Sequence, residues 1–375
     1  MLKGVYLTLM IGPAVPVPAP QSVVDALTGV QVTSAVDRSG FQLTFGVGKN
    51  SPLLTTMLPA GYLDPVVTRV IIIATVNGIP NVLMDGMITR QELAPSDEPG
   101  KSTLTVTGED LSVLMDLVEM PFMRFPAMPD AAQVALILSK YAVLGIVPIV
   151  IPPVIIDVPI PTKEIPTQSG TDLAYIKQLA GNNGYVFYVE PGPVPGANIA
   201  YWGPDIRIPI PQPALNFNMD AQTNVESLNF SFDGLAKKIT VLTVLDPVTG
   251  KIPIPVPIPN ISILRPPLGA KLPLPAKVEF YQYGTKLNIT QAIARGLAIS
   301  FTSADSISAT GSLNVVRYGH VLKSRQLVGV RGAGIAYNGL YYVKSVTHNI
   351  KRGEYKQSFN LSRDGLISLT PKVAP

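Results

Sequence analysis

Three pairs of acidic residues have the type and spacing that catalysis by carboxylates requires. They are Asp97 with Glu98, Glu109 with Asp110, and Asp116 with Glu119. Two carboxylates that line one cleft can act as acid and base in glycoside hydrolysis, provided that one pKa is raised. Glu109 and Asp110 stand where a helical pattern begins, and exposed backbone N–H groups favour negative charge there. We therefore expect this pair to support a helix start, and Asp116 and Glu119 to be solvated.

The sequence contains few residues that could carry out imidazole or thiolate chemistry. Cysteine is absent, and His320 and His348 are the two histidines among 375 residues. Thiolate nucleophiles, iron–sulfur clusters and thiolate zinc sites are thereby excluded. His348 shares a predicted strand face with Leu340, Tyr342 and Val346, which predicts a hydrogen-bonded histidine inside a β structure.

Two glycine patterns resemble nucleotide-binding motifs only in part. Gly100-Lys101-Ser102 looks like the end of a phosphate-binding loop, but Pro95 occupies the position of its first glycine. Gly332 and Gly334 begin a dinucleotide fingerprint, but Tyr337 replaces its third glycine, and a β-turn or bulge explains them better. The sequence therefore predicts no catalytic residue, no cofactor site and no metal site.

The composition predicts extensive burial between proteins. Apolar residues make up 47% and charged residues 14% of the chain, against about 25% charged in an ordinary soluble domain. A membrane does not explain this, because the most apolar window, Leu144 to Ile160, contains four prolines and a spanning helix needs about 20 uninterrupted residues. We therefore expect no membrane span and large subunit interfaces.

Charge is divided unevenly along the chain. Residues 1–187 hold 10 basic and 15 acidic side chains, net −5, whereas residues 188–375 hold 19 and 10, net +9. The basic residues of the second half are dispersed, and no nucleic-acid-binding motif accompanies them. We expect no nucleic-acid partner.

Alternating hydrophobicity predicts strands in residues 1–108. Phe41, Leu43, Phe45 and Val47 share one face of a strand. Strands over 66–76 and 82–89 flank a tight hairpin at Asn77-Gly78, and 102–107 alternates again. About five strands suggest a small antiparallel barrel.

Helical spacing dominates residues 109–215. A leucine repeat follows position 111, and Asp130 with Gln133 predicts a capped helix that ends near Gly145. Another helix is predicted to begin at Ser169 or Thr171 and to stop at Asn182-Asn183-Gly184, before a strand over 185–189. These residues form an α/β module.

Strands resume in residues 216–375. They are expected at 228–232, 238–245, 313–316, 326–331, 340–350 and 355–361, with one helix at 289–301. A proline-rich insertion covers 247–276. Its prolines at 253, 255, 257 and 259 remove every donor from one edge of the segment, so it is an edge strand, a polyproline II stretch or a recognition ligand.

These patterns predict a mixed β and α+β fold. Two similar antiparallel β-barrel domains, 1–108 and 216–375, flank an inserted α/β domain, 109–215.

Three passages together resemble the central baseplate hub family of contractile injection systems. This family includes phage late control D proteins, phage tail hubs and the hub part of type VI secretion spike proteins. The passages are Gly170 to Val189, Asp85 to Thr89 leading to Gly108-Glu-Asp-Leu111, and Gly339 to His348 with Tyr355 to Arg363. Their order and spacing agree over nearly the whole chain.

The resemblance implies a homotrimer in which two tube-type domains per chain form a pseudo-sixfold ring. Such a trimeric adaptor joins a threefold spike to a sixfold inner tube. The implied partners are two further copies of the chain, a separate spike protein, an inner tube or tube-initiator protein, and other baseplate components. The resemblance also implies that the protein assembles in the bacterial cytoplasm into a phage tail or into a contractile injection particle, which can be released from the cell.

Two alternatives stay open at the level of sequence. One is a cell-wall-degrading hydrolase of the same kind of particle, with an acidic pair as its active site. The other is a receptor-binding tail protein, which the proline-rich segments would favour if they lay exposed at a tip. The proline-rich segments are not a general feature of the hub family.

Overall fold

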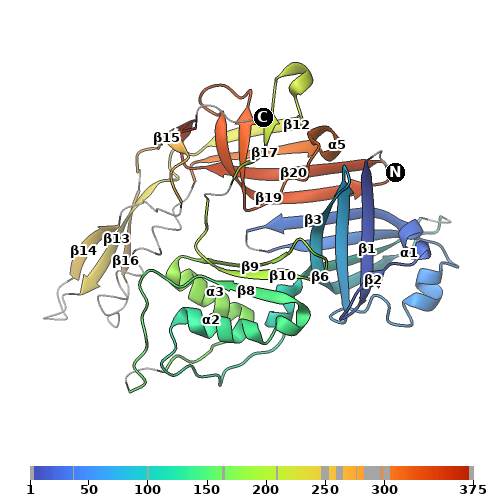
Figure 1. Cartoon of the computed structure of the whole chain (residues 1–375), viewed down its shortest axis with the longest axis horizontal. Helices are drawn as coiled ribbons and strands as arrows, with labels where there is room; N and C mark the ends of the chain where they lie inside the picture. The colour runs from blue at the N-terminus through green and yellow to red at the C-terminus, as the bar shows by residue number, and fades with distance from the viewer. Residues whose placement is uncertain are drawn as a thin grey trace.

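A computed structural model of the chain shows one large, mainly antiparallel sheet, a compact α/β insert and a small projecting arm (Figure 1). It describes residues 4–36, 38–98, 101–162, 165–207, 210–245, 253–258, 265–275, 277–282, 296, 298 and 305–370. The structure confirms the mostly antiparallel β architecture with few helices.

The large sheet contains 13 strands among the described residues. In spatial order, its main path runs β12 (Val225–Phe232), β17 (Ile307–Asn314), β20 (Glu354–Arg363), β19 (Gly339–Lys351), β3 (Leu27–Ala35), β4 (Gly40–Val47), β7 (Ser102–Asp110), β6 (Ile79–Ala94), β5 (Thr68–Val76), β1 (Val5–Pro13) and β2 (Val17–Pro18). Beside this path, β18 (Leu327–Arg331) pairs with β19 and, in parallel, with β11 (Gln212–Asn216).

The first and second β regions meet at the pairing of β19 with β3. Seven residue pairs join them, from Ser345 opposite Ala35 to Lys351 opposite Gly29. Buried side chains of both regions form one hydrophobic cluster, which includes Val32 and Leu43 from the first region and Val343 and Phe359 from the second. The two β regions are therefore continuous in both hydrogen bonding and core.

In the first β region, strand β4 and the β5–β6 hairpin form where the sequence predicted them. Alternate residues of β4, from Phe41 to Val47, are buried. The β5–β6 hairpin turns at Asn77 and Gly78, whose φ angles are 51° and 83°. Two positive φ angles match the twist of the adjoining strands, which explains the Asn-Gly sequence.

The insert, residues 111–207, has its own hydrophobic core around Trp202, Ile176 and Phe125. It contains a 3-10 helix (Leu111–Asp116), α2 (Asp130–Ser139), a second 3-10 turn (Ala142–Leu144), β8 (Ile146–Val150), α3 (Asp172–Asn183), β9 (Val186–Pro191) and β10 (Asn198–Gly203). The strands form a sheet in the order β8-β10-β9, on which α2 and α3 pack. Figure 1 shows this insert in green below the large sheet.

Three residues were predicted to cap the helices of the insert, and two of these predictions are confirmed. Thr171 Oγ1 accepts a hydrogen bond from Ala174 N, and Gly184 ends α3 with a φ of 66°, as predicted. The cap at Asp130 was wrong, because Pro129 precedes the helix and Asp130 is its first residue. The Asp130 carboxylate instead accepts from Asn183 Nδ2 at 2.7 Å.

The arm is a three-stranded sheet in the order β14 (Pro253–Ile258), β13 (Lys238–Leu245) and β16 (Lys277–Gln282). Prolines 253, 255 and 257 lack N–H donors, so β14 can donate to β13 only through the residues between them. Of the three predictions for this segment, the edge strand is the one confirmed. The helix predicted at 289–301 lies outside the described residues except for positions 296 and 298, as does much of the insertion at 247–276.

The remaining elements are short. They are α1 (Gln21–Ala26), a π-helical turn (Leu53–Met57), a 3-10 turn (Asp220–Gln222), α5 (Val315–Tyr318), and β15 (Gly269–Lys271) paired with β21 (Leu366–Ser368). The strand predicted at 313–316 was wrong, because β17 ends at Asn314. The Asn314 side chain accepts hydrogen bonds from Val316 N and Arg317 N and starts α5.

Candidate functional site

The acidic pair Glu109–Asp110 serves local structure. Asp110 is buried, and its carboxylate accepts hydrogen bonds from Ser112 N at 2.9 Å and Ser39 N at 3.2 Å. Glu109 lies 3.2 Å from the exposed guanidinium of Arg38. Neighbouring residues of a strand point to opposite faces, so this pair does not converge on one cleft. Asp110 supports a helix start, as the sequence predicted.

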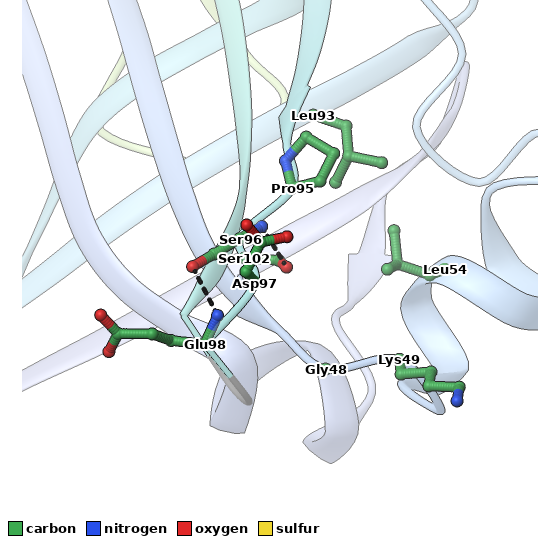
Figure 2. Close-up of a pocket in the computed structure, with 9 residues that line it drawn as sticks. All are labelled: Gly48, Lys49, Leu54, Leu93, Pro95, Ser96, Asp97, Glu98 and Ser102. Atoms are coloured by element: carbon green, nitrogen blue, oxygen red, sulfur yellow. Dashed lines mark hydrogen bonds between the residues drawn. The ribbon is translucent and has the colours of Figure 1, made fainter.

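The pair Asp97–Glu98 lies at the tip of the β6–β7 hairpin, beside a shallow pocket of about 320 Å³ (Figure 2). Ser96 N donates to Ser102 Oγ and Glu98 N donates to Ser96 Oγ, which shapes the tip. Glu98 also forms an ion pair with Lys101. Lys101 and Ser102 thus belong to a hairpin tip, which agrees with the rejection of a phosphate-binding loop.

The two residues of the third acidic pair, Asp116 and Glu119, each make a separate contact with Thr171. Asp116 accepts a hydrogen bond of 2.6 Å from Thr171 Oγ1, so it links the first 3-10 helix of the insert to the start of α3. Glu119 forms a β-bridge with Thr171 through the backbone. Asp116 and Glu119 are both exposed, as predicted, and Asp116 has Thr171 as a partner in addition.

His348 is a fully buried polar residue, as predicted. Its Nδ1 lies 2.8 Å from the Tyr355 hydroxyl, and Gln357 Nε2 is 3.3 Å away. Burial lowers the pKa of His348 to about 3, so the imidazole is neutral at physiological pH. His320 is exposed beside Tyr318. The two histidines therefore lie in unrelated environments.

The second glycine pattern forms a turn. Gly332 and Gly334, with φ angles of 86° and 79°, connect β18 to β19. Of the β-turn and the bulge that the sequence allowed, the turn is the one present, with Tyr337 N donating to Gly334 O at 3.1 Å. Among the residues that the structure describes, no three histidine, aspartate or glutamate side chains gather in a way that could hold a metal ion. The described helices include none with the length and apolarity to cross a bilayer.

Charged residues gather instead where the insert meets the first β region. At this first junction, Arg69 from β5 forms a bidentate ion pair with Asp85 from β6. Its Nε donates to Asp85 Oδ1 at 2.6 Å, and its Nη2 donates to Asp85 Oδ2 at 2.7 Å. Asn198 Nδ2 from β10 donates to Asp85 at 2.9 Å, and Arg69 also donates to Gly196 O at 3.2 Å. Arg69 and Asp85 are 5% and 1% exposed. The pair fixes the insert to the sheet.

A larger charged cluster joins the insert to the second β region. At this second junction, Arg207 lies 2.9 Å from Asp305 and 3.3 Å from Asp205. Arg265 lies 3.6 Å from Asp205, and the Tyr342 hydroxyl donates to Asp205 at 2.7 Å. The Arg207 guanidinium also stacks over the Tyr342 ring, 4.3 Å from its centroid.

The electrostatics of this cluster favour permanent charge. Burial acts to raise the pKa of Asp305, but the charge and hydrogen bond of Arg207 outweigh it and lower the pKa to about 2. A carboxylate with such a pKa stays ionised and is a poor proton donor. The second junction therefore holds parts of the chain together rather than acting as an acid–base centre.

A third contact lies close to the pairing of β3 with β19. Arg325 lies 3.2 Å from Glu190 of β9 and stacks over Tyr188, 4.0 Å from the ring centroid. Its guanidinium also donates to Ala35 O at the end of β3. One arginine thus contacts the insert and the first β region from a position just before β18.

Sequence reasoning missed all three of these contacts. A signal was present, since Arg69 interrupts the β-branched run 66–76 and Asp85 stands inside the next apolar strand. Charged residues are almost never fully buried unless they are paired. Opposite charges in neighbouring predicted strands therefore indicated a buried ion pair.

Large apolar side chains are exposed along two segments. In the proline-rich stretch after β8, Val154 is 82% exposed and Ile156, Val158 and Ile160 are also exposed. On the arm, Ile239 and Val278 are paired neighbours on one face, which Phe280 shares. Extended apolar surface of this kind marks protein–protein contact.

Comparison with known proteins gives a match at the level of structure. No protein-family model matches the sequence, and no curated protein matches it. A tail protein from Neisseria meningitidis MC58 aligns with 97% of this chain and 98% of its own, at 13% identity and a TM-score of 0.60. The 43 kDa tail protein of prophage MuSo2 from Shewanella oneidensis aligns with 96% and 99%, at 14% identity and a TM-score of 0.62.

The chain has a phage tail-protein fold. A chain of the Francisella PdpA–VgrG complex also aligns, at 9% identity and a TM-score of 0.61. This alignment covers 100% of the present chain but 60% of the Francisella chain. The tail proteins are matched along almost their entire length, so the fold of a whole tail protein is present in the large sheet, the insert and the described part of the arm.

Proposed function

We propose that this protein is the structural hub of a phage tail baseplate or contractile injection machine. Three copies would form the adaptor that joins a threefold spike to the sixfold inner tube. The observation that carries the proposal is the structural match to two tail proteins, one of them from a prophage, over nearly the full length of both chains in each comparison. The motif resemblance to the hub family and the exposed apolar segments add independent support.

The domain division belongs to this proposal. Residues 1–108 and 216–375 would be two similar barrel-like tube domains, and residues 109–215 the inserted α/β domain. In a trimer, two such β domains per chain supply six near-equivalent positions around an axis. The direct pairing of β3 with β19 supports this arrangement, because it holds the two β regions in a fixed relative orientation.

Its role would be mechanical rather than enzymatic. The partners would be two further copies, a spike protein, the tube or tube-initiator protein and other baseplate components. Assembly would take place in the bacterial cytoplasm, within a phage tail or injection particle. The hydrolase alternative gains no support from the acidic pairs, because Asp110, Asp116 and Glu109 each have a structural partner.

Light scattering coupled to gel filtration tests the proposal at micromolar concentration. The expected mass is three times the 40.0 kDa of the chain for the protein alone, or that mass plus the mass of the spike after mixing with a spike protein. A particle of one chain mass under both conditions contradicts the proposal. Removal of the exposed apolar side chains Val154, Ile156 and Val158 by serine substitution tests whether that segment supports assembly.

A further inference from the structure

A polar hollow of about 480 Å³ lies between the end of β18, the turn after β11 and the helix α5. Its described lining residues are Asn216, Ala221, Gln222, Thr223, Asn224, Arg317 and Arg331. In Figure 1 the turn after β11 rises above β12, at the opposite end of the molecule from the insert. The hollow therefore lies apart from both charged junctions.

The walls of the hollow are held in place by specific contacts. Asn216 pairs with Arg331 in the β11–β18 register, and Phe217 N donates to Arg331 O at 2.9 Å. Asn224 closes the turn, because its Oδ1 accepts from Asn216 N at 2.7 Å and its Nδ2 donates to Ala214 O at 2.9 Å. A site whose walls are fixed in advance loses little conformational entropy when a ligand binds.

The turn also packs tightly against the loop that follows β18. A side chain at Gly332 would place its Cβ 1.7 Å from Phe217 O, so a glycine is required at this contact. Met219 N donates to Thr223 Oγ1 at 2.9 Å, which fixes the far wall. The close packing and the hydrogen bonds explain how a turn with positive φ angles at Asn218 and Asp220 keeps one conformation.

Two arginines give the hollow an uncompensated positive charge. Within the described part of the chain, neither Arg317 nor Arg331 has an ion pair or a side-chain hydrogen bond, and the described lining includes no carboxylate. By contrast, Arg69, Arg207 and Arg325 each bind a carboxylate. Guanidinium groups bind carboxylates through parallel hydrogen bonds. The hollow is therefore suited to an anionic group.

One further polar atom indicates the kind of anion. Asn216 Oδ1 is buried and has no hydrogen-bond partner among the described residues. A buried acceptor without a donor is costly. Because Asn216 lines the hollow, a rotation of its side chain lets this oxygen accept from a ligand that brings an N–H or O–H group as well as a negative charge. A peptide with an acidic side chain does so, because its backbone N–H lies close to its carboxylate.

We propose that this hollow binds an acidic peptide segment of a protein partner. The carboxylate contacts Arg317 and Arg331, and a backbone N–H of the same segment donates to Asn216 Oδ1. The proposal concerns a binding site of its own and does not depend on the trimeric hub proposed above, so failure of either leaves the other intact.

Fluorescence anisotropy with the full chain tests the site. The probe is a fluorescein-labelled peptide with adjacent glutamate and aspartate residues, and the control peptide carries glutamine and asparagine instead. We expect saturable binding of the acidic peptide that weakens as salt rises. The double variant Arg317→Gln/Arg331→Gln should bind about tenfold or more weakly, because two charge-assisted contacts are lost. Arg124→Gln, an exposed arginine of the insert, should bind like the unmodified protein.

Several results would overturn the proposal. They are the absence of saturable binding, equal binding of the acidic and amide peptides, and equal binding by the double variant. Competition by inorganic phosphate at lower concentrations than unlabelled acidic peptide would also overturn it, since the site would then recognise phosphate rather than a peptide.

Discussion

The insert is fixed to the two β regions in two different ways. At the first junction, a single ion pair between Arg69 and Asp85 is enclosed. Asn198 donates to Asp85, and Arg69 also donates to Gly196 O and Ala14 O. At the second junction, Arg207 shares two carboxylates, Asp205 and Asp305, with other cations. At the first junction, each charged side chain has one partner of opposite charge. At the second junction, Arg207 has two carboxylate partners, and Asp205 also pairs with Arg265. Removal of one charge should therefore cost more at the first.

Asp85→Asn should have the largest effect on stability. It leaves the Arg69 guanidinium buried without a counter-charge, which costs about 3–5 kcal/mol in buried pairs. Urea unfolding followed by the fluorescence of Trp202, the single tryptophan, measures this loss inside the insert. The double variant Arg69→Met/Asp85→Leu, which removes both charges, is the control and should be more stable than Asp85→Asn. If Asp85→Asn lowers the free energy of unfolding by less than about 1 kcal/mol, Asp85 is not the essential partner of Arg69 at the first junction.

Asp305→Asn should cost less, about 2 kcal/mol near neutral pH, because Arg207 retains Asp205. The folded pKa of Asp305, about 2, lies below its usual 3.8. Its stabilising contribution is thus present above pH 4 and is lost as pH falls toward 2. The difference in unfolding free energy between the unmodified protein and the variant should shrink over that interval. A difference that stays constant from pH 5 to pH 2 would show that Asp305 is not held ionised by Arg207.

Tyr188→Leu should have a smaller effect, about 1 kcal/mol, because it removes the ring beneath Arg325 but leaves the Arg325–Glu190 pair. Tyr188→Phe keeps the ring and serves as the matched control. Thermal unfolding of both variants separates the stacking contribution from the hydroxyl. Equal losses in the two variants would assign the effect to the hydroxyl and not to stacking.

Glu109→Gln should have the smallest effect, below about 0.5 kcal/mol, since the Arg38–Glu109 pair lies at the surface. The change in the free energy of unfolding for this surface pair is the reference for the changes expected at the two buried junctions. A turbidity assay on peptidoglycan with the same variant should show no activity, as should the unmodified protein. Hydrolysis by the unmodified protein that disappears in Glu109→Gln would revive the hydrolase alternative.

Local features of the fold were predictable from sequence. Alternation in β4, the Asn77-Gly78 turn, the Thr171 cap and the Gly184 stop each depend on residues within about four positions of one another. Errors occurred where a distant partner decides the outcome. Asp130 binds Asn183 across the insert and does not cap its own helix.

Long-range pairing was the part that sequence patterns did not reveal. The alignment of β19 with β3 joins residues more than 300 positions apart, and alternation in each strand fits many partners equally well. The charges of the second junction follow the same rule, because Arg207 and Asp305 lie 98 positions apart in the sequence. The hollow near Arg317 likewise combines residues 216–224 with Arg317 and Arg331, about 100 positions further along the sequence.

The central claim is that three copies of this chain supply six near-equivalent β positions around one axis. Electron cryomicroscopy of the purified protein, viewed along the symmetry axis, tests it most directly. We expect a threefold ring in which the first and second β regions alternate at similar radius, with the insert outside them. A solitary subunit, or a ring in which only one of the two β regions lines the centre, would contradict the account.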